Sequence, residues 1–281
     1  MKSSSNAEIR RCRPLLGTLV EVTASGLEEA DLQEAVNCAF AAIGQIHDRM
    51  SIHDPDSELS RLNREALTRP VCVSRTLFAV VRRAERLATE SGGAFDPAIA
   101  PVLARWGYLP LGLRRKHAGT WRDLLILPGR KVRFLKPLAL DLGGIAKGFA
   151  VDSAIEILRR RGVESAVVNA GGDLRVFGGQ PSTICLRHPA QPRLLMDGIR
   201  LRDAALATSS PCFTEKKWHG KLVSHLVNPS TRNAIIGAKS VSVKAGECWL
   251  ADALTKVVLN APLRAHALLA KYRAEAFVLA A

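Results

Sequence analysis

The sequence predicts an α+β fold in which mixed or antiparallel sheets pack against helices. Two features lead to this prediction. Apolar residues recur at helical spacing in several irregularly placed segments, and short strand-like segments follow one another across glycine turns. The regular alternation of strand and helix that is typical of a parallel, doubly wound sheet is not found in the sequence.

The first half of the chain is mainly helical. In the longest segment, residues 28–50, Leu32, Val36, Phe40 and Ile43 recur at steps of three and four and define one face. Serines suited to N-cap positions begin two further helices, and a glycine pair ends the second. The predicted elements are a strand at 19–22, the helix at 28–50, a short helix from Ser57, a helix from Ser74 to about Ser91, a helical segment at 97–106, and loops with short strands over 116–137.

The second half combines short strands with three helices. Val151, Ala154 and Leu158 give one apolar face to the first of these helices. The predicted elements are a strand at 138–140, a helix at 145–161, strands at 166–168 and 173–177 around a turn at 171–172, several short strands over 182–245, helices at 248–260 and 262–272, and a last strand at 274–279.

Length and composition indicate a globular protein. The chain has 281 residues, 47% of them hydrophobic, which suffices to bury a large core. We assign residues 1–13 to an N-terminal tail and residues 14–281 to the domain. No apolar run approaches the roughly 18 residues of a membrane span. The segment before Pro14 has no apolar signal-peptide core, so we expect a cytoplasmic protein as the sequence stands, and a periplasmic one if a leader was removed.

The net charge of +14 favours anionic partners in general, and it equally fits a protein that is basic for solubility. The basic residues lie in short clusters without interleaved aromatic residues, which argues against nucleic acid as a partner. The six cysteines form no C-x-x-C pair. Neither a zinc ribbon nor a disulfide framework is therefore predicted.

The most informative motif is D-L-G-G-I-A-K-G, residues 141–148, at a predicted strand-to-helix junction. Paired glycines let a backbone approach a ligand closely, and amides at a helix N-terminus attract phosphate. Lys147 adds a positive charge suited to a diphosphate. The spacing matches neither the Walker motif nor the dinucleotide fingerprint. Taken alone, it also fits a glycine turn that caps a buried helix, which is the commoner occurrence.

Three further polar elements have both a functional and a structural interpretation. Asp173 is expected to bond nearby backbone in a tight turn. His225 lies in an apolar, strand-like segment, where a histidine is more often structural than catalytic. Asp252 and Thr255 can present two oxygens to Mg²⁺, and Asp252 and Lys256 can equally form a helical ion pair. The spacing alone favours the ion pair.

Together and in this order, these elements resemble the FAD:protein FMN transferase family, also called the ApbE family. The most specific part is the run D-L-G-G-I-A-K-G-x-A-x-D at residues 141–152. M-S-I-H-D-P-D-S-E-L-S-R-L-N at 50–63, A-F-D-P at 94–97, W-G at 106–107 and P-L-L-G-T at 14–18 add to it. The resemblance extends from Pro14 to the final predicted strand.

The resemblance implies an α+β flavin-transferase fold with one FAD site. It implies an enzyme that cleaves FAD at its diphosphate, attaches the FMN half to a threonine of a partner flavoprotein through a phosphoester, and releases AMP, with Mg²⁺ assisting. Cations and amides near the diphosphate oxygens suit this chemistry, because negative charge shifts there in the transition state.

Carried over position by position, the resemblance assigns catalytic roles to Lys147, His225 and Asp252. His225 is expected near the reacting phosphate, where it orients the diphosphate or takes the proton of the attacking threonine. The expected ligands of FAD are Met50, Ala94, Phe95, Asp96, Asp141, Lys147 and Val227, and those of the metal are the Gly144 carbonyl, Asp252 and Thr255.

The sequence departs from the family pattern near the expected metal. The family has a threonine four residues after the metal-binding aspartate, and this chain has Lys256 there. Either Thr255 reaches the ion instead, or the Lys256 ammonium takes its place and holds diphosphate charge without acting as a Lewis acid. The family's D-P-x-T-G reads N-P-S-T-R at 228–232, and its T-S-G reads T-S-S at 208–210. Two alternatives to transfer follow: binding of FAD without transfer, and hydrolysis of FAD to FMN and AMP.

Overall fold

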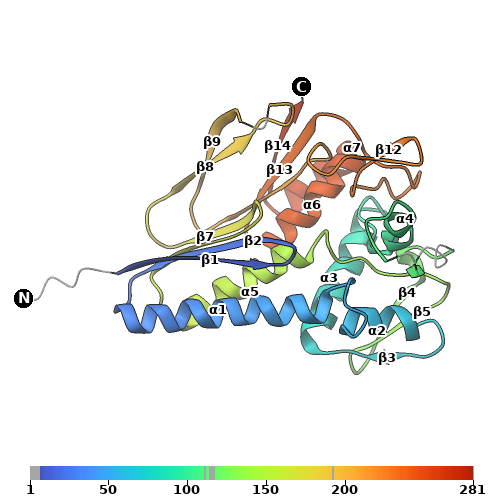
Figure 1. Cartoon of the computed structure of the whole chain (residues 1–281), viewed down its shortest axis with the longest axis horizontal. Coiled ribbons are helices and arrows are strands. Elements are labelled where there is room, and N and C mark those ends of the chain that lie inside the picture. The colour runs from blue at the N-terminus through green and yellow to red at the C-terminus, as the bar shows by residue number, and fades with distance from the viewer. Residues whose placement is uncertain (1–6, 111, 114–117, 192, 281) are drawn as a thin grey trace, which may run out of the picture.

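The structure, a computed structural model, describes residues 7–110, 112–113, 118–191 and 193–280, and within them its centre is a seven-stranded sheet (Figure 1). All neighbouring strands of this sheet pair antiparallel. In spatial order the strands are β1 (Glu8–Leu15), β2 (Thr18–Ser25), β6 (Ser165–Ala170), β7 (Asp173–Phe177), β10 (Ala205–Ser209), β13 (Lys239–Ala245) and β14 (Glu275–Ala280).

Helices cover one face of this sheet and enclose the main core. α5 (Ala146–Arg160) and α6 (Cys248–Asn260) pack on the sheet, and the long α1 (Glu29–Met50) packs on α5 (Figure 1). Alternate residues of β2 and β6 are buried in this core, with Val22 and Val168 wholly inaccessible. α7 (Pro262–Lys271) packs beside α6. The predicted α+β class is confirmed.

A hairpin covers the other face of the sheet. It consists of β8 (Ser182–Arg187) and β9 (Leu195–Leu201), which pair antiparallel. Leu186 and Leu201 of the hairpin form a second apolar cluster with Leu174, Val176 and Leu206 of the sheet. Both faces of β7 and β10 are therefore covered.

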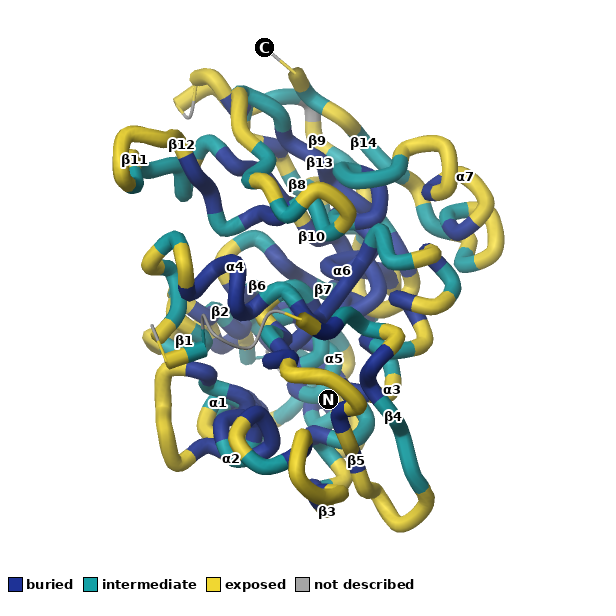
Figure 2. The backbone as a smooth tube through the Cα atoms, turned by 90° about the vertical axis from the view of Figure 1, so that its right-hand side faces the viewer, coloured by how far each residue is buried: buried dark blue, intermediate teal, exposed yellow. Residues whose placement is uncertain are grey.

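The chain between α1 and α5 forms a smaller layer at the side of the main sheet (Figure 1). A three-stranded sheet in the order β3-β5-β4 lies there with helices around it. Figure 2 shows exposed backbone at the turn of a further hairpin, β11–β12, and buried backbone along α6. The remaining elements are α2 (Glu58–Glu65), β3 (Val71–Cys72), α3 (Arg75–Glu90), η1 (Pro97–Ile99), α4 (Ala100–Arg105), η3 (Trp121–Asp123), β4 (Leu124–Leu127), β5 (Lys131–Phe134), β11 (Lys216–Trp218) and β12 (Lys221–Val223).

Most elements lie where the sequence predicts them. Ser57 and Ser74 are the N-caps of α2 and α3, and their hydroxyl oxygens accept from the amides of Ser60 and Leu77 at 3.1 and 3.2 Å. α1, α5 and α6 agree with the predicted helices to within one residue at each end. None of the helices in the described part of the chain has the length and apolar character needed to cross a membrane.

Two predictions about local structure are wrong. Residues 8–13, assigned to a tail, belong to β1 and pair with β2. Residues 138–140 are not a strand. This segment is buried, and Asn63 holds it by donating to the Leu140 carbonyl at 3.0 Å and accepting from the Leu140 amide at 2.8 Å. Residues 1–6 of the predicted tail, and residues 116–117 at the start of the predicted loop region, lie outside the described residues.

α5 and α6 cross at Gly148, and this crossing places Asp252 beside the first turn of α5. A Cβ atom at Gly148 would lie 2.4 Å from the carbonyl oxygen of Cys248, so only glycine permits the close approach. The Gly148 amide donates to Asp252 Oδ2 at 3.4 Å. Asp152 of α5 accepts from the amides of Cys248 and Trp249 at 2.9 Å each and so caps α6.

We expect Asn63→Ala to lower the free energy of unfolding by about 2 kcal/mol, because the buried amide and carbonyl of Leu140 lose their partner. Urea denaturation measures the change. Asn37→Ala is the control, since Asn37 is exposed on α1, and it should change stability by less than about 0.5 kcal/mol. An effect of Asn63→Ala no larger than that of the control would contradict the role given to this side chain.

We expect Gly148→Ala to lower the free energy of unfolding by about 2 kcal/mol, because the new Cβ forces α5 and α6 apart. The matched control is Gly44→Ala in α1, where an added Cβ meets no atom within 4 Å. That change should raise stability by about 0.5–1 kcal/mol through helix propensity. Thermal and urea denaturation of both variants test the contrast, and equal effects would refute it.

Candidate functional site

A cavity of about 1350 Å³ is formed where the helices meet the ends of β7 and β10. This exceeds the roughly 300–1000 Å³ of typical small-molecule pockets and suits a larger ligand. Its walls come from the C-terminal end of α1, segment 94–96, turn 141–144, the first turn of α5, the start of β7, the end of β10, segment 225–229 and α6. Residues far apart in the sequence thus share one cavity.

Most of the predicted site residues line this cavity. Asp252 and Thr255 are exceptions, because both are completely buried behind the wall. Lys256, which follows them on α6, does reach the cavity. The predicted residues on the wall are Met50, Ala94, Phe95, Asp96, Asp141, Gly144, Lys147, His225 and Val227.

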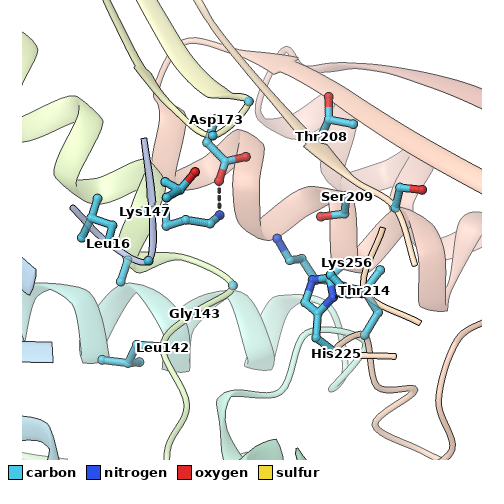
Figure 3. Close-up of a pocket in the computed structure, with 18 of the residues that line it drawn as sticks. Leu16, Leu142, Gly143, Lys147, Asp173, Thr208, Ser209, Thr214, His225 and Lys256 are labelled. Carbon is cyan, nitrogen blue, oxygen red and sulfur yellow. Dashed lines mark hydrogen bonds and ion pairs between the residues drawn. The ribbon is translucent and has the colours of Figure 1, made fainter. Parts of the chain in front are cut away.

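Lys147, in the first turn of α5, is held by two carboxylates. Its ammonium forms an ion pair with Asp173 at the start of β7 and lies 3.8 Å from Asp252 Oδ2 (Figure 3). Burial lowers the pKa of Lys147, but the charges of Asp173 and Asp252 outweigh burial and raise the pKa above its usual value. Lys147 is therefore positively charged at neutral pH.

Asp252 lies between two ammonium groups. Lys256, one helical turn further on, forms an ion pair with Asp252 Oδ1 and donates to the Asp252 carbonyl oxygen at 3.0 Å. Burial raises the pKa of Asp252, but Lys147 and Lys256 outweigh burial and lower the pKa. Asp252 is therefore ionised, and the ion pair favoured by its spacing to Lys256 is present.

Thr255 is turned away from the cavity. Its hydroxyl donates to the Asp252 carbonyl oxygen at 2.6 Å and lies 2.7 Å from the hydroxyl of Ser209 in β10. Ser209 is the middle residue of the T-S-S segment and agrees with the family's T-S-G, which this sequence leaves only at Ser210. The two hydroxyl groups therefore join α6 to the sheet.

The residues that the resemblance assigns to a metal do not fit Mg²⁺ in this arrangement. Mg²⁺ requires oxygen ligands on all sides, and the Lys256 ammonium occupies the cavity side of Asp252. The same side chain passes close to Gly144, since a Cβ atom there would lie 3.3 Å from Lys256 Cε. Across the described ranges, no group of three or more His, Cys, Asp or Glu residues is placed to hold a metal ion.

The turn before α5 is closed by Asp141. Its Oδ1 accepts from the Gly143 amide at 3.1 Å, and a Cβ atom at Gly143 would lie 3.3 Å from that oxygen. Burial raises the pKa of Asp141, although the Gly143 amide opposes this shift. The tight turn brings Gly144 and Lys147 onto the cavity wall.

In the view of Figure 3, Lys256 lies between Lys147 and His225. Its Nδ1 is 2.5 Å from the hydroxyl oxygen of Thr214, and that hydroxyl donates to the Pro211 carbonyl at 3.1 Å. Because the Thr214 hydrogen is used there, we assign the ring hydrogen to Nδ1, which donates to Thr214. Nε2 then carries a free lone pair.

The segments expected to contact the flavin are tied together by Asn260. Its amide nitrogen donates to the Ala94 carbonyl at 3.0 Å and to the Val227 carbonyl at 3.4 Å. Val227 also packs with Val102 and Leu103 of α4. The last turn of α6 therefore fixes two separate parts of the cavity wall.

Asp96 is held by Arg232, a residue that departs from the family pattern. Asp96 accepts from the Ala98 amide at 2.8 Å, and its Oδ2 lies 3.6 Å from Arg232 Nη2. Arg232 stands where the family has glycine, and its φ of 58° is in the left-handed region that glycine favours. The arginine therefore adopts the backbone shape of the glycine and adds a charge beside Asp96.

The sequence pattern predicted a wrong partner for Asp173 and did not indicate Thr214 or Asn260 as site residues. The prediction that Asp173 bonds its own turn is wrong, because Asp173 pairs with Lys147, 26 residues away. No local pattern indicates that pairing, and none indicates Thr214. Asn260 could have been found, because it follows Asp252 and Lys256 at steps of four on one helical face.

Comparison with known sequences shows the family to which this chain is related. The sequence profile of the ApbE family matches residues 16–278. An FAD:protein FMN transferase from Vibrio cholerae is 31% identical over 227 residues, which cover 75% of this chain and 68% of that protein. An FAD:protein FMN transferase from Rhodobacter capsulatus is 32% identical over 256 residues, which cover 85% of this chain. The alignment spans about half of that relative, 49% of its length.

Solved structures share the fold over nearly the whole chain. The flavin transferase ApbE from Vibrio cholerae superposes with a TM-score of 0.83 at 26% identity, covering 97% of this chain and 93% of that one. The ApbE protein of Thermotoga maritima gives a TM-score of 0.84 at 25% identity, covering 98% and 94%. The family match, the fold and the shared motifs agree, and this chain belongs to the ApbE family.

Proposed function

We propose that this protein transfers the FMN part of FAD to a threonine side chain of a partner flavoprotein and releases AMP. Similar proteins from Vibrio cholerae and Rhodobacter capsulatus are named FAD:protein FMN transferases. The observation that carries the proposal is that two lysines and a histidine line the same cavity as a group of apolar residues. FAD combines an anionic diphosphate with an apolar flavin ring, so its parts match this wall.

Each part of the cavity has a role in binding. Met50, Phe95 and Val227 offer apolar surface to the flavin ring. Lys147 and Lys256 offer positive charge to the diphosphate. Both lysines are partly shielded from water, which strengthens the hydrogen bonds that they make to phosphate oxygens, and each is also paired with a carboxylate.

In the proposed reaction, the hydroxyl oxygen of the partner's threonine attacks the phosphorus of the FMN half. A phosphorus–oxygen bond forms to the threonine, the bond from that phosphorus to the bridging oxygen breaks, and AMP leaves with that oxygen. Lys147 and Lys256 stabilise the charge that shifts onto the diphosphate oxygens. His225 accepts the hydroxyl proton on Nε2. Mg²⁺, which the resemblance implies, has no step here, because the expected ligands do not fit it.

The environment of His225 keeps its imidazole neutral. Burial first, and then the positive charges of Lys256 and Lys147, lower the pKa of His225 to about 4, although Asp252 opposes them. The imidazole is therefore neutral at neutral pH, and Nε2 is free to take a proton. The unfolded pKa is about 6.5, so the unfolded chain binds more protons below that pH. His225 thus reduces stability as the pH falls from about 6.5 to about 4.

We expect His225 of the ligand-free protein to titrate with a midpoint near pH 4, because burial and the two lysines disfavour its charged form. NMR of the imidazole resonances measures the midpoint, and His225→Gln identifies the signal by its loss. A midpoint near the ordinary value of about 6.5 would contradict the assigned environment.

The function itself is tested by incubating the protein with FAD and a threonine-bearing flavoprotein fragment, and weighing the fragment by intact-mass spectrometry. We expect a gain equal to one attached FMN, with AMP in solution. A fragment with that threonine changed to alanine should gain nothing. His225→Gln should still bind FAD but form adduct at least about 100-fold more slowly, because the proton acceptor is lost.

Other products would decide between the alternatives. Free FMN and AMP without adduct would mean that water replaces the threonine, and the protein would be an FAD pyrophosphatase. Bound, unchanged FAD with every fragment would mean a binding protein that transfers nothing. Either result would refute the transferase.

A further inference from the structure

We propose that the Lys256 ammonium takes the place of a divalent cation in this site, so that the chain binds the FAD diphosphate without Mg²⁺. This inference rests on the proposed function, because it concerns the diphosphate of the same FAD. It departs from the metal-assisted reaction that the resemblance implies.

The first argument is that every oxygen of Asp252 already has a partner. Oδ1 pairs with Lys256, and Oδ2 accepts from the Gly148 amide at 3.4 Å and faces Lys147 at 3.8 Å. The carbonyl oxygen accepts from Thr255 at 2.6 Å and from Lys256 at 3.0 Å. A metal ion could bind Asp252 only after an ammonium group had been displaced.

The second argument is position. The Lys256 side chain lines the cavity and is 17% exposed, whereas the Asp252 side chain behind it is 0% exposed. The aliphatic part of Lys256 also fills the space beside Gly144, whose carbonyl was an expected metal ligand. A diphosphate entering the cavity therefore meets the ammonium before it can approach Asp252.

The third argument is the number of donors. A lysine ammonium has three N–H groups, and Asp252 takes two of those of Lys256, at Oδ1 and at the carbonyl oxygen. One N–H group is left for a phosphate oxygen. Lys256 thus does what a cation does here: it neutralises Asp252 and binds the diphosphate.

The fourth argument is electrostatic. A divalent ion at Asp252 would lie beside the ammonium groups of both Lys147 and Lys256. Repulsion between like charges is strong where water is excluded. Removing Lys256 from a buried carboxylate is also costly, because it breaks a buried ion pair.

The decisive experiment uses the unaltered protein. Isothermal titration calorimetry compares the FAD dissociation constant in excess EDTA with that in millimolar Mg²⁺ at matched ionic strength. We expect the two constants to agree within about threefold, because the resident ammonium makes the ion unnecessary. Tighter binding in Mg²⁺ by more than that factor would overturn this inference while leaving the proposed function intact. Failure to bind FAD in either buffer would overturn both.

Two variants at position 256 test whether Lys256 replaces a metal ion or only contacts the phosphate. In EDTA, Lys256→Thr and Lys256→Met should each weaken FAD binding by about tenfold or more, since a charged hydrogen bond is lost. Mg²⁺ should restore binding to Lys256→Thr, which regains the hydroxyl of the family pattern, and not to Lys256→Met. Wild-type affinity of both variants in EDTA would refute the proposal.

The proposal would also be refuted if Lys256→Thr lost FAD affinity and Mg²⁺ did not restore it. Lys256 would then be an ordinary phosphate contact that does not occupy the position of a metal ion. Circular dichroism and thermal melting of each variant without FAD show whether it is folded. If a variant is unfolded, the comparison of buffers with the unaltered protein still decides the question.

Discussion

The buried carboxylate of Asp252 is the constraint on which the rest of the site depends. A charge that is wholly removed from water needs partners, and Asp252 has the ammonium groups of Lys147 and Lys256 and the amide of Gly148. These three partners belong to α5 and α6, and Lys147 also forms an ion pair with Asp173 of β7. One carboxylate therefore fixes the relative positions of two helices and a strand, and with them the polar wall of the cavity.

The scaffold makes that arrangement possible by bringing backbones close together. Glycine at position 148 lets α5 and α6 cross so closely that the amide reaches the carboxylate. Asp152 caps α6 and also pairs with Arg175 of β7 at 2.6 Å, so the helices and the sheet are joined a second time. On its far face β7 packs against the β8–β9 hairpin. The cavity wall is thus built from elements that pack on one another in the core.

Three positions that depart from the family pattern change its charge: Asn228 lacks the charge of the family's aspartate, and Arg232 and Lys256 each add a positive charge. Arg232 adopts a glycine-like backbone and approaches Asp96, while Lys256 covers Asp252. Ser209, which agrees with the family pattern, joins the inward-turned Thr255 to the sheet. A wall that carries its own ammonium groups offers charged hydrogen-bond donors to a diphosphate, although carboxylates balance their charge. These departures form one consistent arrangement.

The sequence by itself determined the α+β class, the helices with regular apolar faces and the serine caps, because each depends on neighbours within a turn or two. Through motifs shared with a family, it also indicated nine of the residues that line the cavity. It did not determine that Asn63 holds residues 138–140, because Leu140 is 77 residues away. It did not show the edge strand at residues 8–13 either, because only Ile9 is buried there and no apolar alternation marks the strand. The ion pair of Asp252 with Lys256 is local, because the two residues are four apart on one helix. The pairing of Lys147 with Asp173, by contrast, was decided by tertiary structure alone. Burial removes water as an alternative partner, and only the packed fold sets which opposite charges meet.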